Sequence, residues 1–313
     1  MFVIWDLFDK GGLMATSFIF SMHLIYDIVH PSMQTRNTNL DDFTSRPLND
    51  SRPLIRHALK LFFLIIFCSC FLQAFSGVKP KIVFLIAERE YRTESSLPKF
   101  AKDHLSKEFD SSFCSAPEEG PSRHFLSNTS FIPTADLLII SVRRRAFQEK
   151  TMNMIQAHIE SGKPVVGIRT ASHPFELRKE EVPKGHAEWT KWDAEVIGGN
   201  YNGHLGKGLI CVIKNLPEAS SHPILEKVAL PFKTPATLYR NSPLPAASKP
   251  LLEGRVKGFQ HEPVAWTHIN PWGGKVFYTS LGHLEDFKKP AFNQLLKNAV
   301  KWCLHSKGQV QLR

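Results

Sequence analysis

The sequence has few cysteines and lacks motifs for nucleic-acid binding. Only five of its 313 residues are cysteines, and no two have CxxC spacing. Cys211 and Cys303 each lie inside an apolar periodic segment, where we expect them to behave as small buried hydrophobic residues. The net charge is +10, but the 39 Lys and Arg residues are scattered along the chain, and no helix-turn-helix, zinc finger or internal repeat occurs. The sequence therefore gives no reason to expect a nucleic-acid partner.

Long apolar runs and metal-type histidine spacings are also scarce. The longest apolar run covers residues 61–72 and is short for a membrane-spanning helix. None of the 14 histidines forms an H-x-H or H-E-x-x-H pattern, so we predict no metal site and no cofactor, although grouped imidazoles would suit zinc. The sequence gives no indication of the oligomeric state.

The first 77 residues differ in composition from the rest. Residues 1–55 form no clear domain. Residues 56–77 combine a basic flank, the apolar run and small residues at Ala74 and Ser76, as a secretory signal peptide does. Because a signal normally begins a chain, and Met14, Met22 and Met33 are alternative starts, residues 61–72 could instead anchor the protein in a membrane or form a buried helix. We expect an exported domain, periplasmic or extracellular, or one anchored outside the cytoplasm.

From residue 79 onward the chain alternates short apolar runs with helical patterns. The runs at 81–87, 135–142 and 165–168 are rich in β-branched residues and indicate strands buried on both faces. Apolar residues at helical spacing follow the first of these strands and also precede the third. This order predicts an α/β fold with a parallel sheet and right-handed crossovers.

The second half of the chain has weaker signals. We expect an edge strand at 109–115, a strand at 209–213 and a pair of late strands at 262–267 and 275–280 around the turn at 270–274. Apolar residues between 292 and 303 predict a closing amphipathic helix. The proline-rich stretch 217–258 is interpreted as surface excursions.

Polar residues follow three of the predicted strands. The carboxyl ends of parallel strands meet at one edge of a sheet, where ligands bind in folds of this class. Turns that only satisfy their own backbone groups are the alternative. The candidates for ligand contacts are Glu88, Arg143, Arg144, Arg169, Thr170 and His173.

Three histidines are candidates for acid–base chemistry because imidazole titrates near neutral pH. His173 follows a strand, His204 ends a glycine-rich loop, and His283 follows Gly282. Glu285 lies two residues after His283, where it could orient the ring or share its proton.

Five segments together resemble the ThuA-like (trehalose utilisation) family, within the glutamine amidotransferase-like superfamily. They are residues 165–173, 199–204, 222–225, 263–267 and 275–283, with the closing Trp302. The resemblance covers about residues 79–305 and leaves 306–313 as a tail. Residues 141–145 and 167–173 resemble a subgroup found in planctomycete bacteria. The implied fold is flavodoxin-like, of the class I glutamine amidotransferase type, in a single domain.

The resemblance also implies a position for the active site and limits its chemistry. True amidotransferases carry a nucleophilic cysteine at the turn where this chain has Arg169, and a guanidinium cannot attack an amide. His283 and Glu285 fall where the other triad members would be. We therefore expect a protein of carbohydrate metabolism that binds or cleaves a sugar or keto-sugar, as a hydrolase or lyase, without amidotransferase activity. In this hypothesis Arg169 polarises a carbonyl, and His283 or His204 moves protons. A non-catalytic sugar-binding or scaffold module and a zinc-dependent hydrolase are the alternatives.

Overall fold

The computed structural model describes residues 78–305. The expected N-terminal extension (1–55), the signal or anchor segment (56–77) and the tail (306–313) lie outside this range. None of the helices within it has the length and apolar character needed to span a membrane.

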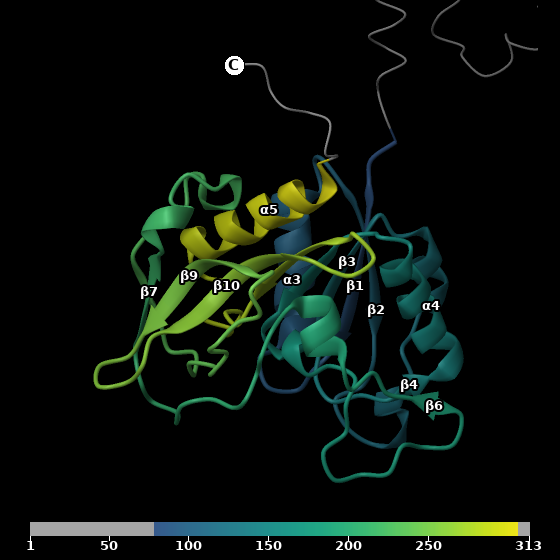
Figure 1. Ribbon diagram of the computed structural model, residues 1–313. Helices are drawn as coiled ribbons and strands as arrows, with labels where there is room; N and C mark the ends of the chain where they lie inside the picture. Colours follow the sequence, from purple (N-terminus) through teal and green to yellow (C-terminus); the bar gives the residue numbers. More distant parts are fainter. Residues whose placement is uncertain (1–77, 306–313) are drawn as a thin grey trace, which may run out of the picture. The chain divides into compact units, whose positions relative to one another are not determined.

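Nine strands form the central sheet in the order β2-β1-β3-β5-β11-β10-β9-β7-β8 (Figure 1). The first five are parallel: β2 (Asp110–Ser115), β1 (Lys81–Ala87), β3 (Leu137–Val142), β5 (Val165–Ile168) and β11 (Lys275–Thr279). The parallel α/β core that the sequence predicts is confirmed, including the edge strand at β2.

The other four strands pair antiparallel and make the sheet mixed. They are β10 (Glu262–Ile269), β9 (Lys249–Arg255), β7 (Cys211–Asn215) and β8 (Phe232–Thr234). The late pair β10–β11 was expected, but interpreting all of 217–258 as surface excursions was wrong, because β8 and β9 lie there. Pro250 and Gly254 obscure the strand pattern of β9. Gly254 is required by packing, since a Cβ there would lie 2.6 Å from a Leu238 methyl group.

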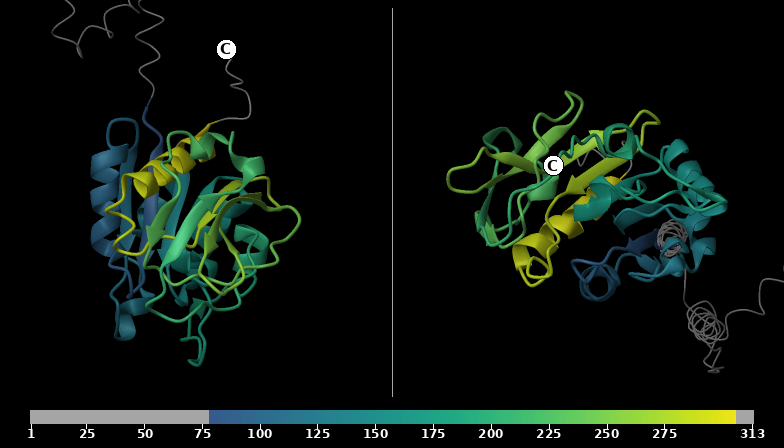
Figure 2. Two further views of the ribbon diagram at one scale, coloured as in Figure 1. Left: turned by 90° about the vertical axis from the view of Figure 1, so that its left-hand side faces the viewer. Right: turned by 90° about the horizontal axis from the view of Figure 1, so that it is seen from below.

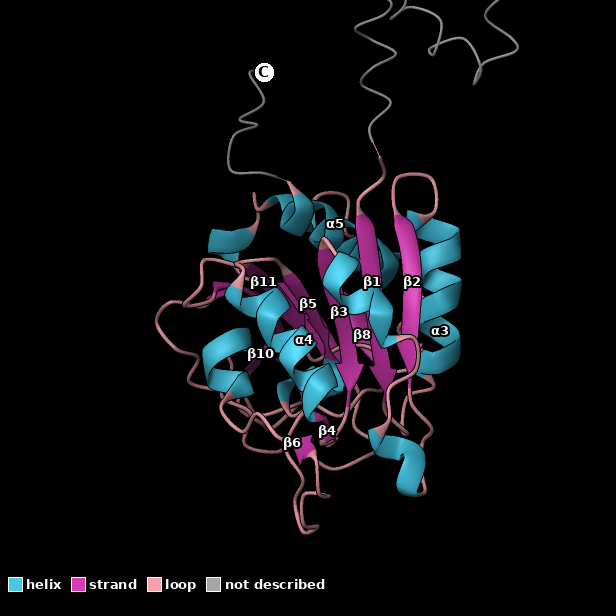
Figure 3. Cartoon of the chain, turned by 90° about the vertical axis from the view of Figure 1, so that its right-hand side faces the viewer, coloured by secondary structure: helices cyan, strands magenta, loops and turns pink. Residues whose placement is uncertain are grey.

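Helices cover both faces of the sheet (Figure 3). One apolar core contains Ile82 and Phe84 of β1 with side chains of α3 (Thr93–Phe100) and α5 (Pro290–Leu304). The other contains Val83 and Leu85 with side chains of α4 (Glu149–Glu160). Alternate residues of one strand thus contribute to opposite cores, which explains why β1 is apolar after its first residue, Lys81. Burying each such side chain stabilises the fold by about 1.5–3 kcal/mol.

Short elements occupy the loops. The turn of π-helix Ala101–Leu105 extends α3, and a second one covers Asp193–Ile197; 3-10 turns cover Pro121–His124, Thr129–Thr134, Arg169–Ser172, Pro217–Ala219 and Pro223–Leu225. A small ladder joins β4 (Phe147–Gln148) to β6 (His186–Ala187). This ladder lies near the edge toward which the arrows of β1 and β3 point in Figure 3, and the right-hand view of Figure 2 looks onto that side.

Candidate functional site

A sharp turn connects β5 to the 3-10 turn that follows it, and Arg169 is at its tip. Arg169 has a φ of 48°, in the left-handed region that costs a non-glycine residue about 1–2 kcal/mol. Gly167 makes room for the turn, because a Cβ there would lie 3.0 Å from both Ile197 and Tyr278. The Tyr278 hydroxyl donates a 2.6 Å hydrogen bond to the Arg169 carbonyl. The chain thus has a strained strand–turn, of a kind on which some enzymes present a nucleophile, and here the residue at its tip is an arginine.

The Arg169 side chain ties several loops together. It is 1% exposed, and its Nη1 donates to the Ser280 carbonyl at 2.6 Å, after the end of β11. Its Nη2 donates to the Tyr91 hydroxyl at 3.2 Å and to Thr237 Oγ1 at 2.9 Å. With these bonds made and so little exposure, the guanidinium cannot reach a substrate carbonyl as the sequence suggested. It positions the residues around it instead.

Two tyrosine rings flank this guanidinium. Its Cζ lies 4.2 Å from the Tyr91 ring centroid and 4.7 Å from that of Tyr239. Tyr201 continues the group, with its ring 4.7 Å from Tyr239 and 4.5 Å from His173. We call Tyr91, Tyr201 and Tyr239 the tyrosine cluster. Because the cation donates to the Tyr91 hydroxyl, that hydroxyl becomes a stronger donor toward a third group.

His283 lies beside the tyrosine cluster, with its ring 6.0 Å from that of Tyr91. Its Nδ1 accepts the backbone N–H of Glu285 at 3.2 Å, so the neutral ring carries its proton on Nε2 and presents a donor there. Partial burial lowers the pKa of His283, with Arg169 contributing, although Asp286 and Glu285 oppose the shift. The ring is therefore neutral at neutral pH.

Glu285 does not orient the His283 ring with its side chain. Its carboxylate pairs with Lys288 at 2.6 Å, and only its backbone N–H contacts the histidine. Asp286 holds this turn instead, since its buried carboxylate accepts the N–H groups of Gly282 and His283 at 3.1 Å. The expectation that Glu285 shares the proton of His283 is not met in this geometry.

His204 has the opposite tautomer from His283. Its Nδ1 lies 2.7 Å from the Leu205 carbonyl, which can only accept, so Nδ1 carries the proton and Nε2 presents a lone pair. His204 is exposed, its backbone bridges to Tyr239, and its ring lies 6.2 Å from the Tyr239 ring. His283 and His204 thus border the two tyrosines that flank Arg169, one as a proton donor and the other as an acceptor.

His173 is buried behind the tyrosine cluster. Its Nδ1 contacts Ser172 Oγ at 2.9 Å, and burial with nearby arginines, Arg144 first among them, holds its pKa well below the usual value. The neighbouring Thr170 is also buried, and its hydroxyl makes no hydrogen bond within the described residues.

Two other sequence candidates serve the loops. The buried Glu88 carboxylate accepts the backbone N–H groups of Glu90, Tyr91 and Thr93, together with the Thr93 hydroxyl. Arg143 pairs with Glu90 at 3.1 Å. Glu88 therefore shapes the loop that carries Tyr91, and its carboxylate has little capacity left for a ligand.

A polar pocket of about 310 Å³ opens beside His173 and Tyr201. Arg144 and Arg178 line it, along with Asp193 and the rings of Trp189 and Trp192. Its volume is at the lower end of the range for small-molecule sites. Burial raises the pKa of Asp193 to about 7. In the part of the chain that the structure describes, no cluster of three or more His, Cys, Asp or Glu side chains is arranged to hold a metal ion.

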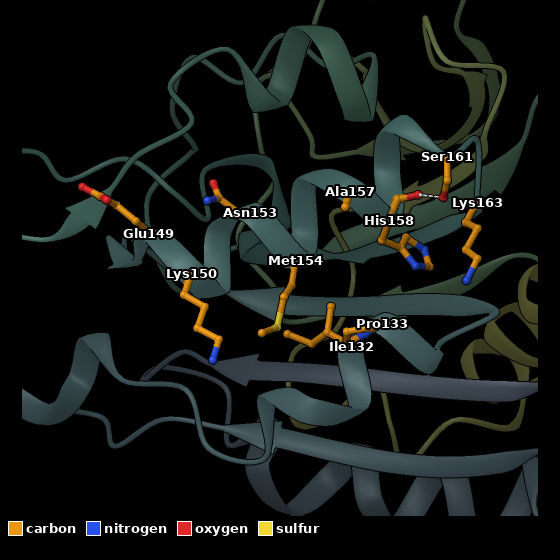
Figure 4. A pocket seen from close by; sticks show the side chains of 10 residues that line it. All are labelled: Ile132, Pro133, Glu149, Lys150, Asn153, Met154, Ala157, His158, Ser161 and Lys163. Atoms are coloured by element: carbon orange, nitrogen blue, oxygen red, sulfur yellow. Dashed lines mark hydrogen bonds between the residues drawn. The ribbon is translucent and has the colours of Figure 1, made fainter.

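A larger hollow, of about 760 Å³, lies elsewhere, on the outer side of α4 (Figure 4). Ile132, Met154 and Ala157 form its apolar part, and Lys150 and Lys163 lie at its margin. It contains none of the candidate residues at the strand ends, so we assign the functional site to the smaller pocket and the tyrosine cluster.

Fold and site together define an α/β protein with a ligand pocket at the carboxyl edge of its parallel strands, built on a strained turn that holds an arginine. The chain belongs to the ThuA family, described as trehalose utilisation, whose model matches residues 91–303.

Two solved structures of ThuA-like proteins share the fold of this chain. A ThuA-like protein from Parabacteroides merdae aligns with a TM-score of 0.53 and 15% identity, covering 75% of this chain and 93% of that one. One from Bacteroides uniformis aligns with a TM-score of 0.51 and 16% identity, covering 72% and 93%. A glutamine amidotransferase from Methylobacillus flagellatus aligns with a TM-score of 0.38 and 11% identity, covering 76% and 100%. None of the curated proteins compared with the chain matches it.

Proposed function

We propose that this protein is a sugar-active enzyme that binds and cleaves a disaccharide related to trehalose, or its keto form, without amidotransferase activity. The family's association with trehalose utilisation supports the substrate class. The observation that carries the proposal is the pair of complementary imidazoles, His283 and His204, on either side of the tyrosines that sandwich Arg169. Such a pair can donate a proton at one point of a substrate and accept one at another.

A keto-sugar suits this arrangement. The Nε2–H of His283 and the hydroxyl of Tyr91 would both donate to the substrate carbonyl oxygen and stabilise the negative charge that develops on it. The free Nε2 of His204 would take a proton from the carbon next to that carbonyl, leaving an enolate. Return of the enolate electron pair would restore the carbonyl, form a C=C bond beside it and break the glycosidic C–O bond at the following carbon. The oxygen of the departing sugar would take up the proton held by His204. Arg169 contributes through Tyr91, whose hydroxyl it polarises, and by fixing the turn after β11 that leads to His283.

The experiment uses the full chain with a keto-disaccharide and follows both product release and exchange of the carbon-bound hydrogen in D₂O by NMR. We expect His204→Ala to lower exchange and turnover by about 10²–10⁴-fold, the range for loss of a general base. His283→Ala should lower kcat by about 10²–10³-fold, the range for loss of one oxyanion donor. His261→Ala, at an exposed histidine whose nearest charged partner is Glu253, is the control. Full activity in both site variants would contradict the proposal.

A non-catalytic sugar-binding module is the second candidate, and a specific observation favours it. The groups at the former triad positions are engaged within the protein: Arg169 with Ser280, Tyr91 and Thr237, and Glu285 with Lys288. This candidate predicts saturable sugar binding with neither hydrogen exchange nor product in the same assay.

We also propose that the domain acts outside the cytoplasm. This proposal rests only on the sequence of residues 56–77, which is similar to that of a signal peptide. Mass spectrometry of the mature protein distinguishes cleavage after Ser76 from retention of the segment.

A further inference from the structure

The polar pocket beside the tyrosine cluster is more basic than a site for a neutral sugar requires. Arg144 and Arg178 both line it. Among residues 78–305, neither arginine has a carboxylate within 4.0 Å, whereas the adjacent Arg143 pairs with Glu90 and the more distant Arg123 pairs with Glu180. Two guanidinium groups therefore line the same small space, and no described carboxylate lies within ion-pair distance of either.

The local backbone fixes the Arg144 side chain at this pocket. Arg144 has a φ of 49°, and its N–H donates to the His173 carbonyl at 3.2 Å. Its Nη1 donates to the Glu176 carbonyl at 3.3 Å, while its Nε is buried and has no partner within the described residues. A left-handed residue at a strand end is a strained feature of the kind that gathers at ligand sites. This backbone conformation places the Arg144 guanidinium at the pocket, and its Nε makes no hydrogen bond within the described residues.

The acidic groups Glu176 and Asp193 in the pocket offset this positive charge only in part at neutral pH. The Glu176 side chain is exposed and forms no ion pair with either arginine in the described structure. Asp193 accepts the backbone N–H of Tyr201 at 2.7 Å with one carboxylate oxygen. Burial raises its pKa to about 7, so this carboxylate is partly protonated at neutral pH and carries less than a full negative charge.

We propose that the pocket binds an anionic group, a carboxylate or a phosphate, on the sugar that this site takes, with Arg144 and Arg178 as its ligands. The inference rests on the proposed function and narrows its substrate class to acidic sugars. The arginine fork matches the two oxygens of a carboxylate or phosphate and forms shorter, stronger hydrogen bonds to them than to a hydroxyl. The buried wall of Trp192 and His173 excludes water on one side, which strengthens the attraction.

The lowered pKa of Arg144 is consistent with an anion-binding role for this pocket. Partial burial lowers the pKa of Arg144, and repulsion from Arg178 lowers it further, while the nearby Glu176 opposes the shift. An anion between the two groups would relieve that repulsion and replace the lost hydration. Tyr201, stacked on His173, would lie at the boundary between this subsite and the tyrosine cluster where we place the reaction.

The test is a titration of the full chain with D-glucuronate, D-glucose 6-phosphate and D-glucose, followed by the fluorescence of Trp189 and Trp192 and by calorimetry. We expect glucuronate, glucose 6-phosphate or both to bind at least about tenfold more tightly than glucose, since one charge-assisted contact amounts to about that factor. Acetate and inorganic phosphate show whether the charge alone suffices, and the two sugar anions distinguish the carboxylate from the phosphate.

Substitutions test whether Arg144 and Arg178 cause the preference for anionic sugars. Arg178→Gln, at an exposed side chain, and Arg144→Gln should each remove most of the preference for the anionic sugar over glucose. Lys179→Gln removes the same charge from the next residue, outside the pocket, and should keep the preference. A weakening by Lys179→Gln equal to that by Arg178→Gln would reduce the effect to overall charge and overturn the proposal.

The outcomes also separate this inference from the proposed function. Equal affinity for glucose and the anionic sugars overturns the anionic subsite and leaves the sugar site standing. Absence of binding by every sugar, neutral or charged, overturns both.

Discussion

Replacing Arg169 by methionine tests whether the buried cation holds the site together. Methionine has a similar length and no charge, so Arg169→Met removes three hydrogen bonds with little loss of volume. The Ser280 carbonyl would remain buried without its partner, at a cost of about 1–3 kcal/mol. Loss of the two cation–π contacts adds about 0.5–1 kcal/mol each. Tyr91 and Thr237 are half-buried and regain water, so they add little.

We therefore expect Arg169→Met to lower the free energy of unfolding by about 2–4 kcal/mol, since these terms combine incompletely. The assay is urea unfolding at pH 7 followed by tryptophan fluorescence, with Arg240→Met as a matched control at an exposed arginine nearby, expected to change stability by less than about 0.5 kcal/mol. Removing a buried charge that lacks a carboxylate partner can also stabilise a protein. A gain in stability would refute the positioning role of Arg169 and show that the charge is kept at a cost.

Two further predictions concern packing and pH. Gly199→Ala would place a Cβ 2.2 Å from Asp193 Oδ1, so we expect a loss of about 1–3 kcal/mol in the same assay, against no such loss for Gly206→Ala, where nothing lies within 4 Å. Burial lowers the pKa of His158 to about 4, whereas the unfolded imidazole titrates near 6.5, so the unfolded chain alone binds a proton between these values. Stability should fall as pH drops through that window, by about 1.4 kcal/mol per pH unit from this residue. His158→Gln, whose amide can keep the hydrogen bond to the Pro164 carbonyl, should flatten that slope in urea midpoints measured at pH 7 and pH 5; an unchanged slope would contradict the assignment.

The parallel half of the fold could be predicted because its strands are buried on both faces. The runs that became β1, β3 and β5 are almost entirely apolar, with Lys81 at the start of β1 and Ser141 in β3 as the polar exceptions, and a central parallel strand favours that pattern. The strand β9 escaped prediction because its pairing with β10 tolerates Pro250 and requires Gly254 for close packing, two residues that usually indicate a loop.

The strand-end rule pointed to some members of the candidate site but not to all of them. It pointed to Arg169 and His173, which follow β5, because position along a strand can be read from the sequence. Tyr239 and Thr237 could not be found this way, since they lie after β8 and reach Arg169 only through the tertiary fold. Tyr91 lies in a polar run after a predicted strand, and Tyr201 lies in a glycine-rich loop. An aromatic residue in such a loop could have indicated a site residue from the sequence alone.

An arginine at the tip of the strained turn limits what that turn can do. A nucleophile must be exposed at such a tip, whereas Arg169 is 1% exposed and its side chain donates to the Ser280 carbonyl. The strained turn, with a φ of 48° at Arg169, therefore does not present a reactive atom to a substrate. It places a fixed positive charge between the loops that carry Tyr91 and Tyr239. Any reaction at this edge of the sheet must then involve side chains around the Arg169 guanidinium. His283 and His204 are the pair to test first, because their neutral rings are opposite tautomers.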